Sequence, residues 1–189
     1  MKTKEKILRR ALELFNESGL TQVGVREIAR SLEISVGNLS YHFPRKEDIV
    51  LALMEKLRAA NERVYQDYFA GLPTLDRFLA ALRRIFENQY RYRGVLIGHD
   101  EINQLIKKHF DYRAVEQRRR QFFHRIFQEL AESGELNLRE GDIEFLISFM
   151  TLFGRFWLLE ASISFADRSQ EAIIDHYLGL IRQQLALFT

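Results

Sequence analysis

The sequence contains no cysteine, which excludes disulfide scaffolds, thiolate zinc sites, iron–sulfur clusters and cysteine nucleophiles. It has only 2 prolines and 10 glycines among 189 residues, so few positions interrupt a helix. Neither charge sign dominates, since the net charge is +2. The N-terminal segment lacks the uninterrupted apolar stretch that a secretory signal requires. We therefore expect a cytoplasmic protein with no metal, no cofactor and no membrane partner.

Long apolar and aromatic side chains are abundant. Hydrophobic residues make up 47% of the chain, with 15 Phe, 7 Tyr and 1 Trp. Apolar residues recur at helical spacing, and no convincing period-2 strand or internal repeat occurs. Helices are expected over residues 4–17, 25–32, 35–42, 46–69, 74–92, 112–133, 142–165 and 169–188, with one or two short helices in 94–108. This pattern predicts an all-α protein of about nine helices with an aromatic-rich core.

One stretch, residues 145–165, is nearly apolar throughout. It is interrupted by Ser148, Thr151, Arg155, Glu160 and Ser162. We interpret it as a buried helix and not as a membrane span.

Positive charge is unevenly distributed along the chain. Residues 1–46 contain nine Lys or Arg against five Asp or Glu, whereas residues 49–189 contain nineteen of each sign. A basic excess at one end favours an anionic partner there. We expect a first domain over residues 1–48 and a second over residues 49–189.

Residues 22–46 carry the strongest functional signal. Two short predicted helices, joined by Glu33-Ile34, follow a longer helix, as in a three-helix helix-turn-helix domain. The last of these three helices, expected over residues 35–42, exposes small or hydrogen-bonding side chains and no charged ones. A purely solvated helix, by contrast, usually carries Lys and Glu. Small residues allow close approach to base edges, amides and hydroxyls form hydrogen bonds to them, and Val36 suits a thymine methyl. Periodicity alone does not distinguish this from an ordinary α-hairpin with small packing residues.

The same segment resembles the N-terminal DNA-binding domain of TetR-type transcriptional regulators. The motifs that carry the resemblance are Val25, Ile28-Ala29, Ile34-Ser35, Gly37, Leu39, Tyr41-His42-Phe43 and Lys46-Glu47, in this order. Each motif alone is weak, but the ordered set is specific. The resemblance covers roughly the first 55 residues by motif, and beyond that it is architectural, since the remainder is helical, aromatic-rich and of fitting length.

Three positions depart from the family pattern. Glu33 stands where the family usually has glycine in the turn, and Gly24 replaces a Thr or Ser N-cap. Ser40 replaces an aromatic residue after Leu39, so it lacks the tyrosine hydroxyl that would contact a phosphate there.

The resemblance implies a role for each matching position. The residues expected to contact DNA are Arg26, Ser35, Val36, Gly37, Asn38, Ser40, Tyr41, His42 and Lys46. Tyr41, Lys46 and Arg26 would hold the DNA backbone, and Val36 through His42 would otherwise face the major groove. Leu39 and Phe43 would belong to the core. For His42, capping or packing against Lys46 is the alternative.

By the same resemblance, the remainder of the chain binds a small effector and dimerises. The last two long helices are apolar on more than one side, and a helix apolar nearly all round is buried on two sides. A partner chain would cover the second side in a two-fold four-helix interface, and one large bundle is the alternative. The expected interface residues are Phe145, Phe156, Ile173, Tyr177, Leu180 and Leu187. The expected pocket residues are Tyr90, His99, Asn103, Phe122, Phe149, Phe153 and Trp157, with close-packed core or solvated surface as the alternative for each.

These patterns predict a homodimeric transcriptional regulator that binds double-stranded DNA. The resemblance implies a repressor that binds a palindromic operator and is released by a small, partly apolar effector. An enzyme is not expected, because no HExxH motif, Gly-rich phosphate loop or nucleophile elbow occurs. The alternative is a helical adaptor that binds another protein through its N-terminal helices.

Overall fold

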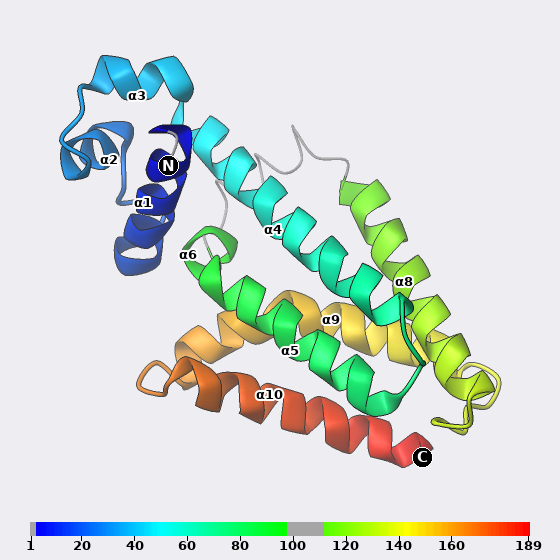
Figure 1. Cartoon of the computed structure of the whole chain (residues 1–189). Helices are drawn as coiled ribbons and strands as arrows, with labels where there is room; N and C mark the ends of the chain where they lie inside the picture. The colour runs from blue at the N-terminus through cyan, green and yellow to red at the C-terminus, as the bar shows by residue number, and fades with distance from the viewer. Residues whose placement is uncertain (1–2, 98–111) are drawn as a thin grey trace. The chain divides into compact units, whose positions relative to one another are not determined.

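The computed structural model describes residues 3–97 and 112–189 (Figure 1). In these ranges the chain forms nine α-helices, a 3₁₀ turn at Ala186–Phe188 and no strand. The expected all-α class is therefore confirmed. The described residues divide into two units, an N-terminal unit of residues 3–60 and 91–97 and a C-terminal unit of residues 61–90 and 112–189.

The helices begin and end within a few residues of the ranges expected from the sequence. They are α1 (Thr3–Ser18), α2 (Val25–Ser31), α3 (Val36–His42), α4 (Lys46–Phe69), α5 (Leu75–Arg91), α6 (Arg93–Leu96), α8 (Tyr112–Glu132), α9 (Asp142–Ser164) and α10 (Gln170–Leu185). Helix α4 is continuous across the division, with residues 46–60 in the N-terminal unit and residues 61–69 in the C-terminal unit. Most of the irregular stretch expected at 94–108 lies outside the described residues.

The N-terminal unit has its own hydrophobic core. Phe15 of α1, Ile28 of α2, Leu39 of α3 and Ile49 of α4 are each 0% exposed and belong to one apolar cluster. Helices α2 and α3 have seven residues each, too few to be stable in isolation, so this shared burial is what holds them.

The end of α1 is fastened to α6 by Asn16. Its amide nitrogen donates to the Arg91 carbonyl at 2.8 Å, and its amide oxygen accepts from the Gly94 N–H at 2.8 Å. The two backbones are so close that a Cβ at Gly94 would lie 2.1 Å from the Phe15 carbonyl oxygen. Glycine is therefore required at this position.

The turn between α2 and α3 is closed by two backbone hydrogen bonds. The Ile34 N–H donates to the Ala29 carbonyl at 3.1 Å, and the Glu33 N–H donates to the Arg30 carbonyl at 3.1 Å, the pattern of a Schellman motif. This motif needs a left-handed residue, and Glu33 has a φ of 54°, the one positive value of a non-glycine residue in the described ranges. Glu33, which stands where the family usually has glycine, therefore has a backbone conformation that favours glycine.

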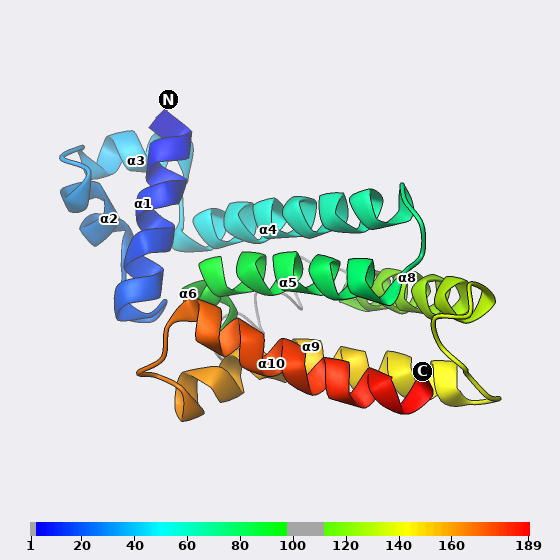
Figure 2. The ribbon, with the colours of Figure 1, turned by 60° about the horizontal axis from the view of Figure 1, so that its bottom comes forward.

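Helix α5 lies at the centre of the C-terminal unit. Its Phe86 ring stacks on Trp157 of α9 with centroids 4.4 Å apart, and its Phe78 ring meets Phe127 of α8 at 5.7 Å. Figure 2 shows α9 and α10 side by side and running in opposite directions. The core of this unit is therefore aromatic, as the composition indicated.

Helix α9 is apolar on two sides. By length and composition alone it could cross a membrane, a test that core helices of soluble proteins also pass. Its Leu146 and Met150 are buried, in agreement with the expected buried helix. On the opposite side, however, Phe145, Leu152 and Phe156 are 50%, 59% and 51% exposed. Among the residues that the structure describes, the helix is therefore buried on one side and exposed on the other.

We expect Glu33→Gly to stabilise the protein. A left-handed non-glycine residue costs about 1–2 kcal/mol, partly offset by the greater freedom that glycine gives the unfolded chain. The net gain of about 0.5–1 kcal/mol should raise Tm by about 1–4 °C in a thermal unfolding experiment. The matched control Glu27→Gly, within α2, should destabilise by about 1 kcal/mol. Equal losses of stability in the two variants would contradict the assigned turn.

Candidate functional site

Helix α3 is held by a cap and by two buried side chains. Ser35 is the N-cap, and its hydroxyl oxygen accepts from the Asn38 N–H at 3.1 Å. Leu39 is 0% exposed and Phe43 is 3% exposed, so one side of the helix faces the core of the N-terminal unit. This burial fixes which side chains of α3 face solvent.

The outer face of α3 carries no Lys, Arg, Asp or Glu. Among the residues predicted to contact DNA, Ser35, Val36, Gly37, Asn38 and Tyr41 are exposed, and Ser40 and His42 are half-buried. The His42 ring lies edge-on to the Tyr41 ring with centroids 5.2 Å apart. The structure therefore brings the predicted DNA-contacting residues of α3 together on one exposed, uncharged surface.

The cations predicted beside this surface differ in their surroundings. Arg26 is exposed on α2. Lys46 is half-buried, and its ammonium donates to the Leu20 carbonyl oxygen at 3.2 Å. Arg45, just before Lys46, is paired with Asp48. Its backbone N–H donates to the Asp48 carboxylate at 2.9 Å, and its guanidinium pairs with the same carboxylate at 3.3 Å. Lys46 thus already has a role inside the protein, whereas Arg26 is presented to solvent.

The predicted pocket residues do not form one group. Phe122 stacks on Tyr65 of α4 at 4.7 Å, in a cluster with Phe69. Phe149, Phe153 and Trp157 belong to a second cluster, between α5, α9 and α10, in which Phe153 and Trp157 both contact Phe86 and Tyr177. Tyr90 is half-buried on α5. His99 and Asn103 lie outside the described residues.

Trp157 is tightly packed within the second cluster. It is 3% exposed, and its indole N–H donates to the side-chain oxygen of Gln89 at 2.6 Å. A buried indole needs such a partner, so this bond fixes the ring against Phe86. Trp157 therefore contributes to the core of the C-terminal unit in this structure.

A charged cluster in the C-terminal unit was not anticipated from the sequence. Glu116 pairs with Arg119 at 3.4 Å and with Arg155 of α9 at 3.2 Å. Nearby, burial raises the pKa of Tyr65 to about 12, against a lowering effect of Arg119, so this phenol is neutral at physiological pH. Successive residues on a helix point about 100° apart, so consecutive arginines on α8 contact different partners. The run of arginines was the feature of the sequence from which these ion pairs could have been anticipated.

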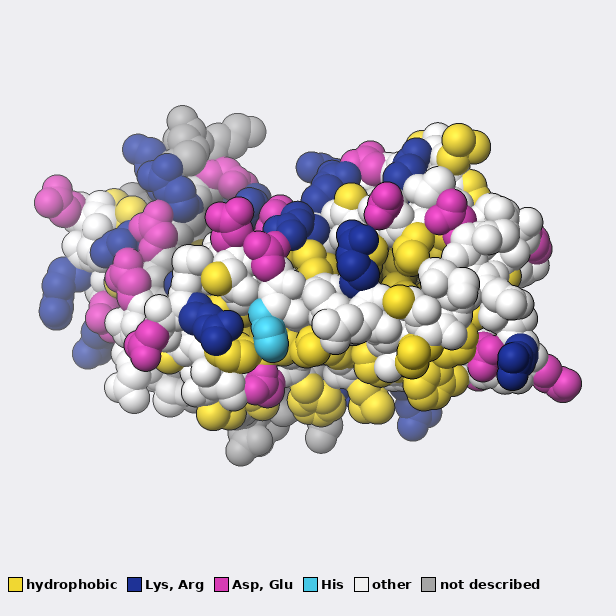
Figure 3. Space-filling model, turned by 90° about the horizontal axis from the view of Figure 1, so that it is seen from below, with side chains coloured by type: hydrophobic (Ala, Val, Ile, Leu, Met, Phe, Trp, Pro, Cys, Tyr) yellow, Lys and Arg dark blue, Asp and Glu magenta, His cyan; other side chains and the backbone are white. Residues whose placement is uncertain are grey.

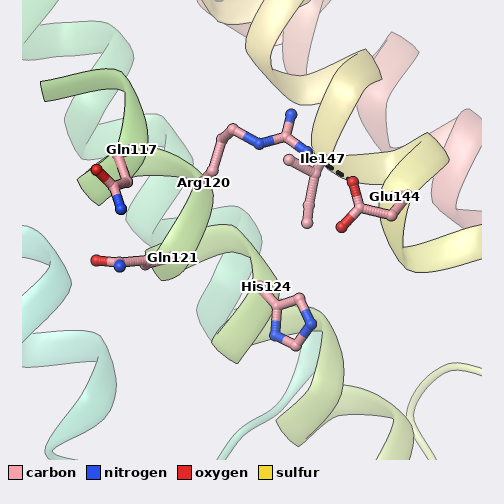
Figure 4. A pocket seen from close by; sticks show the side chains of 6 residues that line it. All are labelled: Gln117, Arg120, Gln121, His124, Glu144 and Ile147. Carbon is pink, nitrogen blue, oxygen red and sulfur yellow. Dashed lines mark hydrogen bonds and ion pairs between the residues drawn. The ribbon is translucent and has the colours of Figure 1, made fainter. Parts of the chain in front are cut away.

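A surface pocket of about 350 Å³ lies between α8 and α9 (Figure 4). Gln117, Gln121 and His124 of α8 line one side, and the Arg120 guanidinium pairs with Glu144 of α9 at 2.6 Å across it. Ile147 is its one buried apolar lining residue. None of the predicted effector residues lines this pocket, and five of its six lining residues are polar or charged.

The predicted interface residues separate into two sets. Four of them are exposed. Phe145 and Phe156 on α9 are 50% and 51% exposed, Leu180 on α10 is 40% exposed, and Leu187, just after α10, is 75% exposed. Ile173 and Tyr177 are only 3% and 4% exposed, so they lie in the core of the chain itself.

Two further apolar side chains extend the exposed set. Leu152 and Ile163 are 59% and 76% exposed, and neither was expected at an interface. Their distances of seven and eighteen residues from Phe145 place all three on one side of α9. Figure 3 looks onto α9 and α10 and shows hydrophobic side chains gathered over them. We call the six residues Phe145, Leu152, Phe156, Ile163, Leu180 and Leu187 the apolar face.

Solved structures share this fold. A TetR-family transcriptional regulator from Marinobacter aquaeolei VT8 is 27% identical, with a TM-score of 0.78 over 87% of this chain and 82% of that one. A tetR-family regulatory protein from Rhodococcus RHA1 is 23% identical, with a TM-score of 0.68 over 98% and 97%. FadR from Bacillus subtilis, solved in complex with stearoyl-CoA, is 19% identical, with a TM-score of 0.66 over 93% and 96%. The last two show the fold alone.

Two curated relatives match part of the chain. The probable HTH-type transcriptional regulator YttP of Bacillus subtilis is 25% identical over 115 residues, which is 55% of this chain and 56% of that protein. The transcriptional regulator AcuR of Cereibacter sphaeroides is 32% identical over 108 residues, 50% and 46% respectively. The chain thus spans about half the length of the curated relatives that it matches.

Family sequence models cover nearly the whole chain. Residues 7–53 match the model of bacterial regulatory proteins of the tetR family, and residues 51–188 match the TetR model described as a bacterial transcriptional repressor. The first match contains the helix-turn-helix and the exposed face of α3, and the second contains the aromatic clusters and the apolar face. The family models and the fold therefore agree that the chain belongs to the TetR family of transcriptional regulators.

Proposed function

We propose that this TetR-family regulator is a cytoplasmic repressor that binds a palindromic operator as a homodimer and is released by a small effector. The observation that carries the proposal is the exposed face of α3, which is uncharged and rich in hydrogen-bonding groups. A solvated helix has no need of this composition, whereas a helix that enters the major groove does.

The exposed residues of α3 supply the chemistry of base contact. The Asn38 side chain is exposed, and an amide of this kind forms two hydrogen bonds to adenine. Arg26 is exposed on the preceding helix, where it would neutralise a phosphate. In a two-fold dimer, two copies of α3 would enter grooves about one helical turn apart, roughly 34–36 Å, or somewhat farther.

DNA binding can be tested with sites selected from a random duplex library. We expect the double variant Asn38→Ala/His42→Ala to lose base preference and to bind its former site at least tenfold more weakly. Arg26→Ala should weaken binding to all sequences and reduce the slope of log affinity against log salt by about 1.

The control is Arg84→Ala, an exposed arginine in the C-terminal unit, which should leave binding unchanged. Affinity that is insensitive to salt and equal in all variants would contradict the proposal and favour the protein-binding adaptor.

The apolar face supports the proposed homodimer. Its six side chains are each at least 40% exposed and lie on the two adjacent helices α9 and α10 and on the 3₁₀ turn that follows α10. Soluble monomers rarely leave contiguous apolar surface of this kind uncovered. Two copies related by a two-fold axis would cover it with a four-helix bundle.

We expect Leu152→Glu/Phe156→Glu to dissociate the dimer, because two carboxylates in each copy would then have to be buried at the interface. The control Leu72→Glu changes a residue that is 75% exposed but lies in the turn before α5. Sedimentation or light scattering should show a monomer for the double variant and a dimer for the control. A double variant that remains dimeric would contradict this assignment of the interface.

The effector is proposed to enter the aromatic cluster between α5, α9 and α10. Phe153 and Trp157 lie there beside Tyr177, whose buried hydroxyl has no hydrogen-bond partner among the described residues. An apolar molecule with a polar group would supply that partner. The stearoyl-CoA complex of the FadR structure agrees with an apolar effector in this fold. Helix α4, shared by both units, would transmit a population shift that releases DNA.

Tyr177→Phe separates a ligand contact from a packing role. Removing an unpaired buried hydroxyl should leave Tm unchanged or slightly higher. Native mass spectrometry of the protein from its own cells identifies bound molecules, and each is then tested for release of the selected DNA. We expect the variant to need at least fivefold more effector than the wild type. Equal sensitivity in both proteins would contradict the proposed contact.

A further inference from the structure

Tyr41 is the most exposed large hydrophobic side chain among the described residues of the N-terminal unit, at 85%. The buried residues Leu39 and Phe43 define the inner side of α3. Tyr41 lies two residues from each of them, which is about 200° around the helix from both. It therefore points directly away from the core.

The space one turn before Tyr41 is open. Gly37 lies on the same outer ridge, four residues earlier, and a Cβ built there meets only the Ser35 hydroxyl oxygen, at 3.9 Å. Helical side chains lean toward the N-terminus, so a group that contacts the Tyr41 ring has room above Gly37. Along the outer side of α3, the open space at Gly37 is thus followed, one turn later, by the Tyr41 ring.

The neighbours of Tyr41 lie to its sides. Ser40 and His42 are each about 100° around the helix from it and are half-buried. When a helix enters a groove, side chains opposite its buried face reach deepest toward the base edges, and side chains on its flanks lie nearer the groove walls. The position of Tyr41 therefore differs from the backbone-holding role that the family resemblance implies for it.

We propose that Tyr41 is a specificity-determining residue that contacts bases, with its ring against the C5-methyl group of a thymine in each half-site. This inference rests on the proposed DNA-binding function and assigns the chemistry of its target. A phosphate could bind the Tyr41 hydroxyl but gains little from the ring itself, whereas contact of the ring with a methyl group removes apolar surface of both partners from water. The open space at Gly37 gives the base edge access to the ring.

The experiment uses the full-length protein and the duplex site selected by the wild type. Each thymine is replaced in turn by uracil, which removes only the methyl group. We expect one symmetric pair of replacements to weaken wild-type binding by about fourfold per half-site, the value of one buried methyl-sized group. Tyr41→Ala should bind the unmodified site more weakly and be indifferent to that replacement, whereas Tyr41→Phe should keep the full effect.

Val36→Ala is the matched control, because Val36 is the other exposed apolar residue of α3, at 43%. Since both side chains are on the surface, circular dichroism melts should show unchanged folding in all three variants.

Three results would overturn the inference. The uracil effect could persist in Tyr41→Ala, it could vanish in Val36→Ala instead, or Tyr41→Phe could lose affinity equally for all sequences, as expected for a hydroxyl that binds phosphate. A wild type that selects no DNA would instead refute the proposed function itself, so the two failures are distinguishable.

Discussion

The burial of Leu39 and Phe43 determines what the N-terminal unit can do. Helix α3 has seven residues, too few to be stable alone, so it exists because these two side chains enter the core. The same two residues set the rotation of the helix, and rotation decides which side chains reach solvent. The Schellman turn then fixes the direction in which α3 leaves α2, at the cost of a left-handed glutamate. The uncharged outer face follows from a packing constraint on the inner face.

Features that depend on near neighbours in the chain were predictable from the sequence. Ser35 and Ser169 cap α3 and α10 with hydrogen bonds to the third residue along, and Gly19 has the positive φ of a helix stop. Helical periodicity gave the bounds of α4 because burial on one side repeats every turn. The resemblance likewise placed Glu33 at the turn position that favours glycine, and its φ of 54° agrees.

Features that depend on distant partners were not predictable. Helices α9 and α10 are apolar on two sides, and nothing in their own sequence says which side meets α5. Tyr177 is buried because Phe153 and Trp157 cover it, whereas Ile163, on the other side of α9, is 76% exposed. Phe122 was grouped with Phe153 by residue type, yet it stacks on Tyr65 of α4. Composition identifies aromatic core residues, but their assignment to clusters requires the tertiary fold.

The exposed Tyr41 ring and the apolar face differ in how much apolar surface they leave in contact with water. A single exposed ring such as Tyr41 is tolerated by a soluble monomer, whereas the six side chains of the apolar face are not readily left in water. Association through that face should therefore precede DNA binding. It would also make DNA binding effective, because one seven-residue helix makes few base contacts. In the proposed dimer, a second copy of α3 would bind its half-site at a high effective concentration. In this scheme the apolar face has no contact with DNA, yet it sets the spacing of half-sites that the protein recognises.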